Sequence, residues 1–369
     1  MEDYIYQHPD WPNFYWDNKK IIPLLSEARN LQGRITGKME TLGFESRDEA
    51  LLETLTQDVI KSSEIEGEIL NPDSVRSSIA QRLGIAFAGI PMYERNVDGM
   101  VDMMIDATNN CFMPITKERL FDWHAALFPT GRSGMFKITV ADWRKDKNGK
   151  MQVISGAAGR ETVHFQAPDA EIIDSEMSIF IDWFNENQDI DLVIKSAVAH
   201  LWFVTLHPFQ DGNGRITRAL TDMLLARSDK STQRFYSMSA QIRIERKSYY
   251  YMLEKTQKGG LDISDWILWF LKCLINALKA TEITLDKVFK KANFWKQLAN
   301  TNFNERQKKV INKLLDTFEG NLTSIKWAKI GNCSKDTAIR DINNLIEKGI
   351  LKKQDAGGRS TSYVLAYYL

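Results

Sequence analysis

The stretch His207-Pro-Phe-Gln-Asp-Gly-Asn-Gly-Arg-Ile-Thr-Arg218 separates two apolar segments and decides which fold we expect. The preceding segment has apolar residues at helical spacing, and Pro208 with the glycines that follow ends that helix. A second apolar helix is expected to begin at about Ile216. The residues that mark the first helix face are Ile194, Val198, Leu201 and Trp202.

The turn between these helices has the composition of an anion-binding site. Gly212 and Gly214 flank Asn213, so the backbone can bend sharply and a bound group can approach it closely. The N–H groups at the start of a helix and its dipole both favour a negative charge there. Arg215 and Arg218 lie one turn apart, so both can face that anion.

Two further side chains complete a site suited to phosphoryl-type transfer. Asp211 offers a hard oxygen ligand for Mg²⁺, the cation that normally accompanies polyphosphate. His207 would be a base beside the phosphate cradle. Positioning, charge neutralisation and removal of a proton from the nucleophile are what such a reaction requires.

Simpler interpretations of the same stretch are weaker. Asp-Gly-Asn-Gly alone is usually a turn, and a single histidine near a helix end is usually structural. A calcium loop is disfavoured because Arg215 and Ile216 stand where an oxygen ligand and a glycine belong. A dinucleotide fingerprint fails because Thr217 replaces its third glycine. All the chemical groups nevertheless occur within twelve residues, which favours a functional site.

Residues 207–218 resemble the complete signature of the Fic family, His-Pro-Phe-x-Asp-Gly-Asn-Gly-Arg-x-x-Arg. The resemblance implies transfer of AMP from ATP to a hydroxyl group of a target protein. It makes His207 the base, Asp211 the Mg²⁺ ligand, and Phe209 a packing anchor. The phosphate-binding residues that it implies are Gly212, Asn213, Gly214, Arg215 and Arg218.

Two other segments fit this resemblance. Met151 to Pro168 is similar to the β-hairpin flap with which Fic proteins hold a target segment by strand addition, with Val163, His164 and Phe165 as candidate contacts. A purely structural hairpin remains the alternative. Tyr250, Leu253 and Gln257 fall on the helix that borders adenine in the family, although such an aromatic run is more often core.

Ser62-Ser-Glu-Ile-Glu66-Gly67 resembles the inhibitory motif of Fic proteins. Ser62 and Glu66 lie one turn apart on one helix face. The resemblance implies that Glu66 pairs with Arg218 and denies it to the γ-phosphate of ATP. The alternative is a solvated acidic helix end, since Glu64, Glu66 and Glu68 cluster there.

The remaining pattern is mainly helical, and residues 1–95 resemble the helical extension of many bacterial Fic proteins. A capping box at Ser46 to Glu49 predicts a helix that Gly67 ends. Asn71 and Gly84 bound another helix. The β-branched residues and glycines of Lys137 to Pro168 predict a hairpin or extended loop. Further helices are expected near 95–108, 116–127, 169–186, 190–206, 214–228, 246–257 and 262–291.

Residues 304–369 have the order of a winged helix-turn-helix, and residues 96–290 are then the catalytic domain. Helices are expected at 305–318 and 323–329 and from Ser334 to Lys348, followed by two strands around Ala356 to Arg359. This segment carries a net charge of +5 and the rest of the chain carries −5. DNA binding through Lys335, Thr337, Arg340 and Arg359 is therefore an alternative, although the charge is modest for such a domain.

Composition places few limits on function. The 369 residues carry no net charge, and three separated cysteines suggest neither a metal site nor a disulfide framework. We see no signal peptide and no apolar run long enough to span a bilayer, so we expect a cytoplasmic protein without a membrane partner. A homodimer is compatible with the resemblance.

Three functions therefore stay open. The first is transfer of AMP to a protein, including the chain itself, restrained by Glu66. The second is a DNA-binding regulator in which the Fic unit acts as a sensor. The third is removal of AMP from a modified protein. The sequence does not identify the target protein, nor whether Ser, Thr or Tyr is modified.

Overall fold

The computed structural model describes residues 4–41, 43–85, 95–146, 149–156, 160–187, 189–316, 318, 320–354 and 361–366. The chain forms two compact units, residues 1–281 and 282–369. The finer division into 1–95, 96–290 and 304–369 stays a prediction. Residues 356–359, where the turn between the last two strands was expected, lie outside the described residues.

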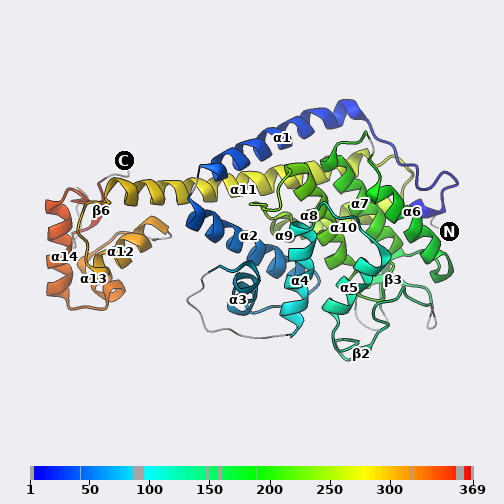
Figure 1. Ribbon diagram of the computed structural model, residues 1–369, viewed down its shortest axis with the longest axis horizontal. Coiled ribbons are helices and arrows are strands. Elements are labelled where there is room, and N and C mark those ends of the chain that lie inside the picture. Colours follow the sequence, from blue (N-terminus) through cyan, green and yellow to red (C-terminus); the bar gives the residue numbers. More distant parts are fainter. Residues whose placement is uncertain are drawn as a thin grey trace. The chain divides into compact units, whose positions relative to one another are not determined.

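The first unit is helical, with two short hairpins (Figure 1). Its elements are η1 (Ile5–Gln7), α1 (Asn18–Glu40), α2 (Phe44–Ile65), α3 (Pro72–Leu83), α4 (Arg95–Asn109), α5 (Lys117–Leu127), β1 (Arg132–Ser133), β2 (Phe136–Lys137), β3 (Gln152–Ser155), β4 (Thr162–Gln166), η2 (Ala170–Ile172), α6 (Ile173–Asn185), α7 (Leu192–Leu206), α8 (Asn213–Asp229), α9 (Met238–Ile244) and α10 (Arg246–Gln257). The following helix, α11 (Ser264–Gln297), continues into the second unit. The prediction of a mainly helical chain is confirmed.

Local signals place most of these boundaries. Asn71 caps α3 by accepting from the Asp73 N–H, and Gly84 ends it with a positive φ of 67°. Helix α2 begins at Phe44, two residues before the predicted cap at Ser46. Helices α1 and α9 were not predicted. Pro23 lies inside α1, and proline normally argues against a helix interior.

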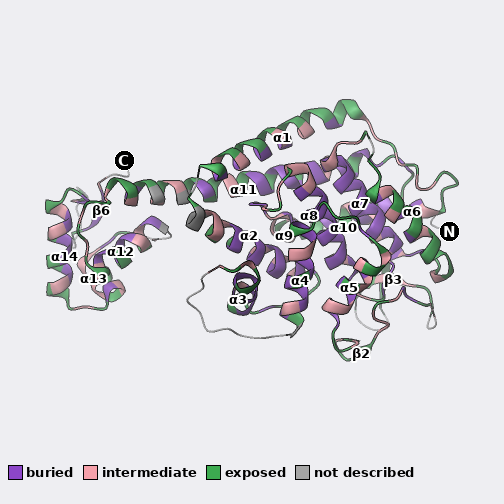
Figure 2. Ribbon diagram, in the orientation of Figure 1, coloured by how far each residue is buried: buried purple, intermediate pink, exposed green. Residues whose placement is uncertain are grey.

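Helices α7 and α8 form the centre of the first unit, where they pack against each other (Figure 1). Both are buried along most of their length (Figure 2). Helix α7 is apolar on all sides, as expected of a helix surrounded by others. The turn that joins α7 to α8 carries residues 207–212, so the candidate site is built on the two best-packed helices.

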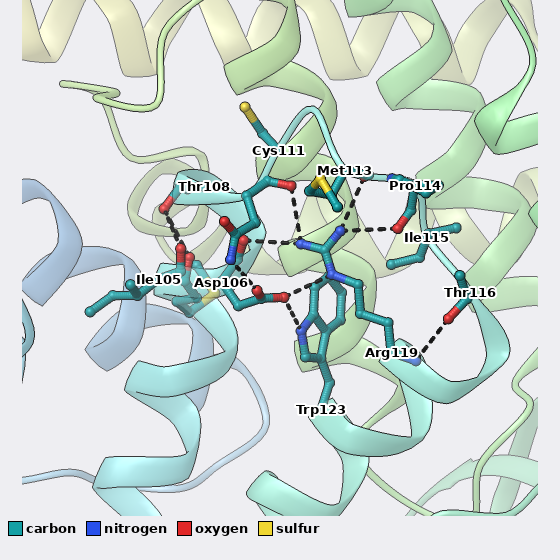
Figure 3. A network of polar contacts seen from close by, with 12 residues as sticks. Ile105, Asp106, Thr108, Cys111, Met113, Pro114, Ile115, Thr116, Arg119 and Trp123 are labelled. Carbon is teal, nitrogen blue, oxygen red and sulfur yellow. Dashed lines mark hydrogen bonds and ion pairs between the residues drawn. The ribbon is translucent and has the colours of Figure 1, made fainter.

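An arginine network fixes the loop between α4 and α5 (Figure 3). Arg119 donates to the carboxylate of Asp106 at 2.8 Å and to the carbonyls of Met113 and Pro114. Trp123 donates to the same Asp106 carboxylate at 2.8 Å. From the last turn of α8, Arg227 donates to the Met113 carbonyl at 3.0 Å. The network therefore holds α4, α5 and the far end of α8 together.

The C-terminal unit contains α12 (Glu305–Asp316), α13 (Ser324–Gly331), α14 (Lys335–Glu347), β5 (Leu351–Lys353) and β6 (Tyr363–Leu365). Strands β5 and β6 pair antiparallel. The predicted cap is present, since Ser334 accepts from the Thr337 N–H at 3.2 Å, and Gly349 follows α14 with a φ of 70°. An apolar core joins these elements and includes Val310, Trp327, Ile342, Leu345 and Ile350.

Candidate active site

His207 stands at the end of α7 in the left-handed conformation, with a φ of 50°. Its ring Nδ1 lies 3.3 Å from the Val204 carbonyl. A proton on Nδ1 can be donated to that carbonyl, which leaves the lone pair on Nε2. Burial lowers the pKa of His207 below its usual value. The ring is therefore neutral near pH 7, the state that a general base requires.

Arg144 fixes the backbone around His207, a role that the sequence analysis missed. Its Nε donates to the His207 carbonyl at 2.8 Å, and its main-chain N–H donates to the Pro208 carbonyl at 2.8 Å. The rest of the guanidinium binds Asp146 and the Pro168 carbonyl. One buried arginine thus ties the end of the β3–β4 hairpin to the candidate base. Its sequence neighbourhood contains no motif that signals this.

The start of α8 lies one residue before the predicted range 214–228 and three residues before the apolar start expected at about Ile216. Helix α8 begins at Asn213 rather than at Ile216, and Gly212 precedes it with a φ of 83°. A Cβ at Gly212 would lie 2.9 Å from the ring of Phe128. Both the positive φ and this close approach therefore require glycine here. The first N–H groups of α8, which have no partner within the helix, therefore belong to the glycine-rich stretch itself.

The side chain of Asn213 stabilises the turn by bonding to the backbone of Phe209. Its Oδ1 accepts from the Phe209 N–H at 2.9 Å, and its Nδ2 donates to the Phe209 carbonyl at 2.8 Å. Phe209 is fully buried, as a packing anchor should be. A ligand can therefore reach Asn213 through its main-chain N–H, while the amide closes the turn.

Asp211 lies beside the same helix start with its side chain 41% exposed. Its Oδ1 accepts from the Gly212 N–H at 2.5 Å and lies 3.7 Å from Arg215. Its Oδ2 accepts from the Ser133 hydroxyl on β1. Among the described residues, no group of three or more His, Cys, Asp or Glu side chains could hold a metal. A single carboxylate of this kind suits a cation that phosphate groups also bind.

His124 on α5 contacts the backbone of the 207–212 turn, a role that the sequence did not indicate. Its Nε2 lies 3.2 Å from the Asp211 carbonyl, and its Nδ1 accepts from the Ala141 N–H at 3.2 Å. The ring stacks on Phe209 with centroids 4.2 Å apart. Burial lowers the pKa of His124 to about 4, so the ring stays neutral and can make both bonds at once.

Arg218 is brought together with both residues of the predicted inhibitory motif. Its Nε donates to the Ser62 hydroxyl at 2.7 Å, and its NH2 donates to the Ser62 carbonyl at 2.8 Å. Its NH1 lies 2.9 Å from Glu66 Oε1, and its side chain is 2% exposed. A Cβ at Gly214 would lie 2.0 Å from that Glu66 oxygen. The Glu66 carboxylate therefore sits directly over the glycine at the start of α8.

Arg215 also has a carboxylate partner, which the sequence analysis did not assign. Its NH1 lies 2.9 Å from Glu68 Oε2, while its guanidinium lies 5.0 Å from the centre of the Phe128 ring. Its side chain is 9% exposed. Both arginines of the motif are thus neutralised by one short segment, residues 66–68.

The three candidate adenine contacts differ in their surroundings. Tyr250 is 38% exposed and its hydroxyl lies 3.4 Å from the Ile65 carbonyl, next to the inhibitory segment. Leu253 is buried, and Gln257 is buried and donates to the Thr205 hydroxyl at 3.2 Å. Only Tyr250 of the three presents an exposed surface in this structure.

The predicted hairpin is present as β3 and β4, which pair antiparallel from Gln152 to Gln166. Val163 is 40% exposed. His164 Nδ1 lies 2.8 Å from Glu254 on α10, and Phe165 is buried against the rings of Tyr4 and Tyr6. His164 and Phe165 therefore anchor the hairpin, and Val163 is the one of the three that faces outward.

Comparison with known families gives two matches along the chain. The family described as Fic/DOC family matches residues 114–225, which include α5, both hairpins, α7 and the first part of α8. A domain of unknown function (DUF4172) matches residues 4–85, which include the segment that carries Ser62 and Glu66. The resemblance of residues 207–218 to the Fic signature is confirmed.

Similar proteins agree with the presence of a Fic domain in this chain. A probable protein adenylyltransferase of Aquifex aeolicus is 27% identical over 97 residues, 26% of this chain and 28% of that protein. A protein adenylyltransferase Fic of Drosophila willistoni is 34% identical over 112 residues, 30% of this chain and 20% of that protein. The chain therefore spans less than a third of either relative.

A Fic family protein from Desulfovibrio desulfuricans G20 has a similar crystal structure, with a TM-score of 0.56 and 19% identity. The match covers 95% of this chain and 97% of that one. At this identity the likeness concerns the fold, which it supports along nearly the whole chain.

Proposed function

We propose that this chain, which carries a Fic/DOC family domain, transfers AMP from ATP to a hydroxyl side chain of a protein and holds itself inactive through Glu66. The observation that supports it most directly is the position of Arg218. This buried cation lies near the start of α8, within the motif that begins at His207. It donates two hydrogen bonds to Ser62 and forms an ion pair with Glu66.

The chemistry follows from the groups that the site brings together. The target hydroxyl would give its proton to Nε2 of His207 as its oxygen attacks the α-phosphorus of ATP. The bond from that phosphorus to the bridging oxygen breaks, and pyrophosphate leaves. Negative charge grows on the phosphates during this step, and the arginines and N–H groups at the start of α8 would stabilise it.

Asp211 is the residue that would hold Mg²⁺. Its carboxylate is partly exposed beside the glycine-rich turn, and its Oδ2 accepts a hydrogen bond from the Ser133 hydroxyl. Mg²⁺ in such sites is normally held by one or two carboxylates together with substrate phosphates. When bound, the cation would neutralise part of the phosphate charge.

Inhibition would be a competition between two anions for one guanidinium. A buried arginine strongly favours a paired state, and Glu66 supplies the partner when ATP is absent. A γ-phosphate would have to displace the carboxylate, and the two negative groups would repel each other. ATP would then bind without the alignment that transfer requires.

The experiment compares AMP incorporation by four full-length proteins with labelled ATP. Glu66→Gly should increase self-modification, Glu66→Asp should give an intermediate increase, and Glu66→Gly with Arg218→Ala should be inactive. The double variant matters because the freed arginine is what the single substitution provides. If Glu66→Gly is no more active than the unchanged chain, residues 62–67 are an ordinary helix end and the proposal is wrong.

A second function is supported by the C-terminal unit. Its order of three helices and an antiparallel hairpin matches that of a winged helix-turn-helix, in which α14 would be the recognition helix. Lys335, Ile339, Arg340 and Asn343 are exposed on α14. We infer that this unit binds an external partner, with DNA as the candidate that the exposed basic residues favour.

A further inference from the structure

Three glutamates, Glu64, Glu66 and Glu68, lie at and just beyond the end of α2, and each pairs with different cations. Glu64 lies 2.7 Å from Lys61 and 3.2 Å from Arg243. Glu66 lies 2.9 Å from Arg218. Glu68 lies 2.9 Å from Arg215. The first pairing involves neither arginine of the 207–218 stretch, whereas the other two neutralise both of them.

The backbone places Glu68 as firmly as it places Glu66. Glu66 is the C-cap of α2, and Gly67 follows in the left-handed conformation with a φ of 86°. The Gly67 N–H donates to the Glu64 carbonyl at 3.2 Å, and the Glu68 N–H donates to the Ser63 carbonyl at 3.0 Å. This pair of bonds is a Schellman motif, which fixes the chain for two residues beyond the cap. Glu66 and Glu68 are therefore delivered to the site as one unit.

The burial of Arg215 makes its contact with Glu68 important for pairing its charge. The guanidinium is nearly buried, packs over the Phe128 ring, and lies 3.7 Å from Asp211 at its nearest. The 2.9 Å contact to Glu68 is therefore shorter than the contact to Asp211. A phosphate group would bind the same planar guanidinium through paired hydrogen bonds. Glu68 and a phosphate must compete for it.

We propose that Glu68 is a second inhibitory carboxylate, which occupies on Arg215 the position that a phosphate of a nucleoside diphosphate would take. The inference rests on the proposed nucleotide-binding role of this site. Glu66 competes for Arg218 with the third phosphate, so it acts on triphosphates. Glu68 competes for a group that diphosphates need too. The chain therefore restrains nucleotide binding itself, in addition to the alignment of ATP for transfer.

The test measures affinity for ADP and for ATP, each with Mg²⁺, by titration calorimetry on the full-length chain. Glu68→Gln keeps the size of the side chain and can still accept from Asn96 Nδ2, which lies 3.3 Å from Glu68 Oε1. It should tighten ADP binding about tenfold, the effect of losing one charge-assisted contact of the competitor. Glu66→Gly should tighten ATP binding while it changes ADP binding less than about twofold.

Glu64→Gln is the matched control, because Glu64 belongs to the same segment but pairs with Lys61 and Arg243 and not with Arg215 or Arg218. It should leave ADP binding unchanged. Gly67→Ala tests the backbone argument, since nothing lies within 4 Å of the added Cβ and only the positive φ opposes it. This variant should tighten ADP binding as Glu68→Gln does.

The outcomes separate the two proposals. Unchanged ADP affinity in Glu68→Gln overturns the role of Glu68, even when Glu66→Gly transfers AMP more rapidly. An equal gain in Glu64→Gln overturns it as well, because the effect would then be general charge. If Glu68→Gln tightens ADP and Glu66→Gly gains no transfer activity, the role of Glu68 stands and the proposed autoinhibition by Glu66 fails.

Discussion

Helices α8 and α14 both begin after a short turn, but they differ in how far their charged side chains are exposed. On α8, Arg215, Arg218 and Asp222 are all less than 10% exposed. On α14, Lys335 and Arg340 are exposed, and the buried Asp341 is the exception. Burying a charge costs free energy unless it is paired. The charges of α8 therefore mark a site in the interior, whereas those of α14 mark a surface on which a partner can bind.

The largest expected effect concerns the base at the interior site. In the Glu66→Gly background, His207→Ala should reduce AMP transfer by about 10²- to 10⁴-fold, the usual contribution of a general base. ATP affinity should change little, because the base acts on the attacking hydroxyl and not on the nucleotide. Transfer is measured with labelled ATP and binding by calorimetry.

Arg340→Ala on α14 is the matched control and should leave transfer unchanged, since its side chain is exposed in the other unit. Equal transfer by His207→Ala and its parent would remove His207 from the mechanism. Loss of ATP binding in the same variant would assign His207 to the binding site instead.

The short motifs of the first unit predicted much of this site. Ser62 and Glu66 reach Arg218 from a segment about 150 residues earlier, as the resemblance implied. A motif records which residue types recur at fixed spacing, so it identifies groups that act together. The site assignment itself still rests on the tests above.

The sequence did not predict Arg144, His124 or Glu68. Arg144 and His124 act on carbonyls of the 207–211 turn, and a contact to a carbonyl leaves no pattern in side-chain types. Glu68 was visible only as one member of an acidic cluster, which usually indicates a solvated helix end. Its role depends on the direction of the chain after Gly67, which is a tertiary fact.

A second difference between the units can be measured as stability. Arg234 lies between two buried carboxylates, 3.0 Å from Asp58 on α2 and 2.6 Å from Asp222 on α8. Burial raises the pKa of Asp222, and the Arg234 guanidinium opposes that shift by favouring the charged carboxylate. Arg234→Met should destabilise the first unit by about 3–5 kcal/mol, because it leaves buried carboxylates without their cation.

In the second unit, Arg306 pairs with Asp341 at 3.0 Å but is 41% exposed. Asp341 also accepts from Asn304, so Arg306→Met should cost less than about 1 kcal/mol. Urea unfolding of the full chain, followed by hydrogen exchange in each unit, measures both variants. If the two variants lose equal free energy of unfolding, the buried cluster of Arg234, Asp58 and Asp222 contributes no more than the exposed pair. The contrast between the two units would then fail.

The smallest expected effect tests the surface of α14. If the C-terminal unit binds DNA through phosphates, the affinity of the full chain for a duplex should fall steeply with salt. Arg340→Ala removes one exposed cation in the N-terminal half of α14, so the slope of log affinity against log salt should become shallower by about one. Lys309→Ala, which removes an exposed cation on α12, should leave the slope unchanged.

The exposed Ile339 beside Arg340 gives the same surface an apolar element that suits a protein partner. Absence of binding to any duplex at low salt would therefore assign α14 to a protein partner, and charge exposure alone would not indicate DNA.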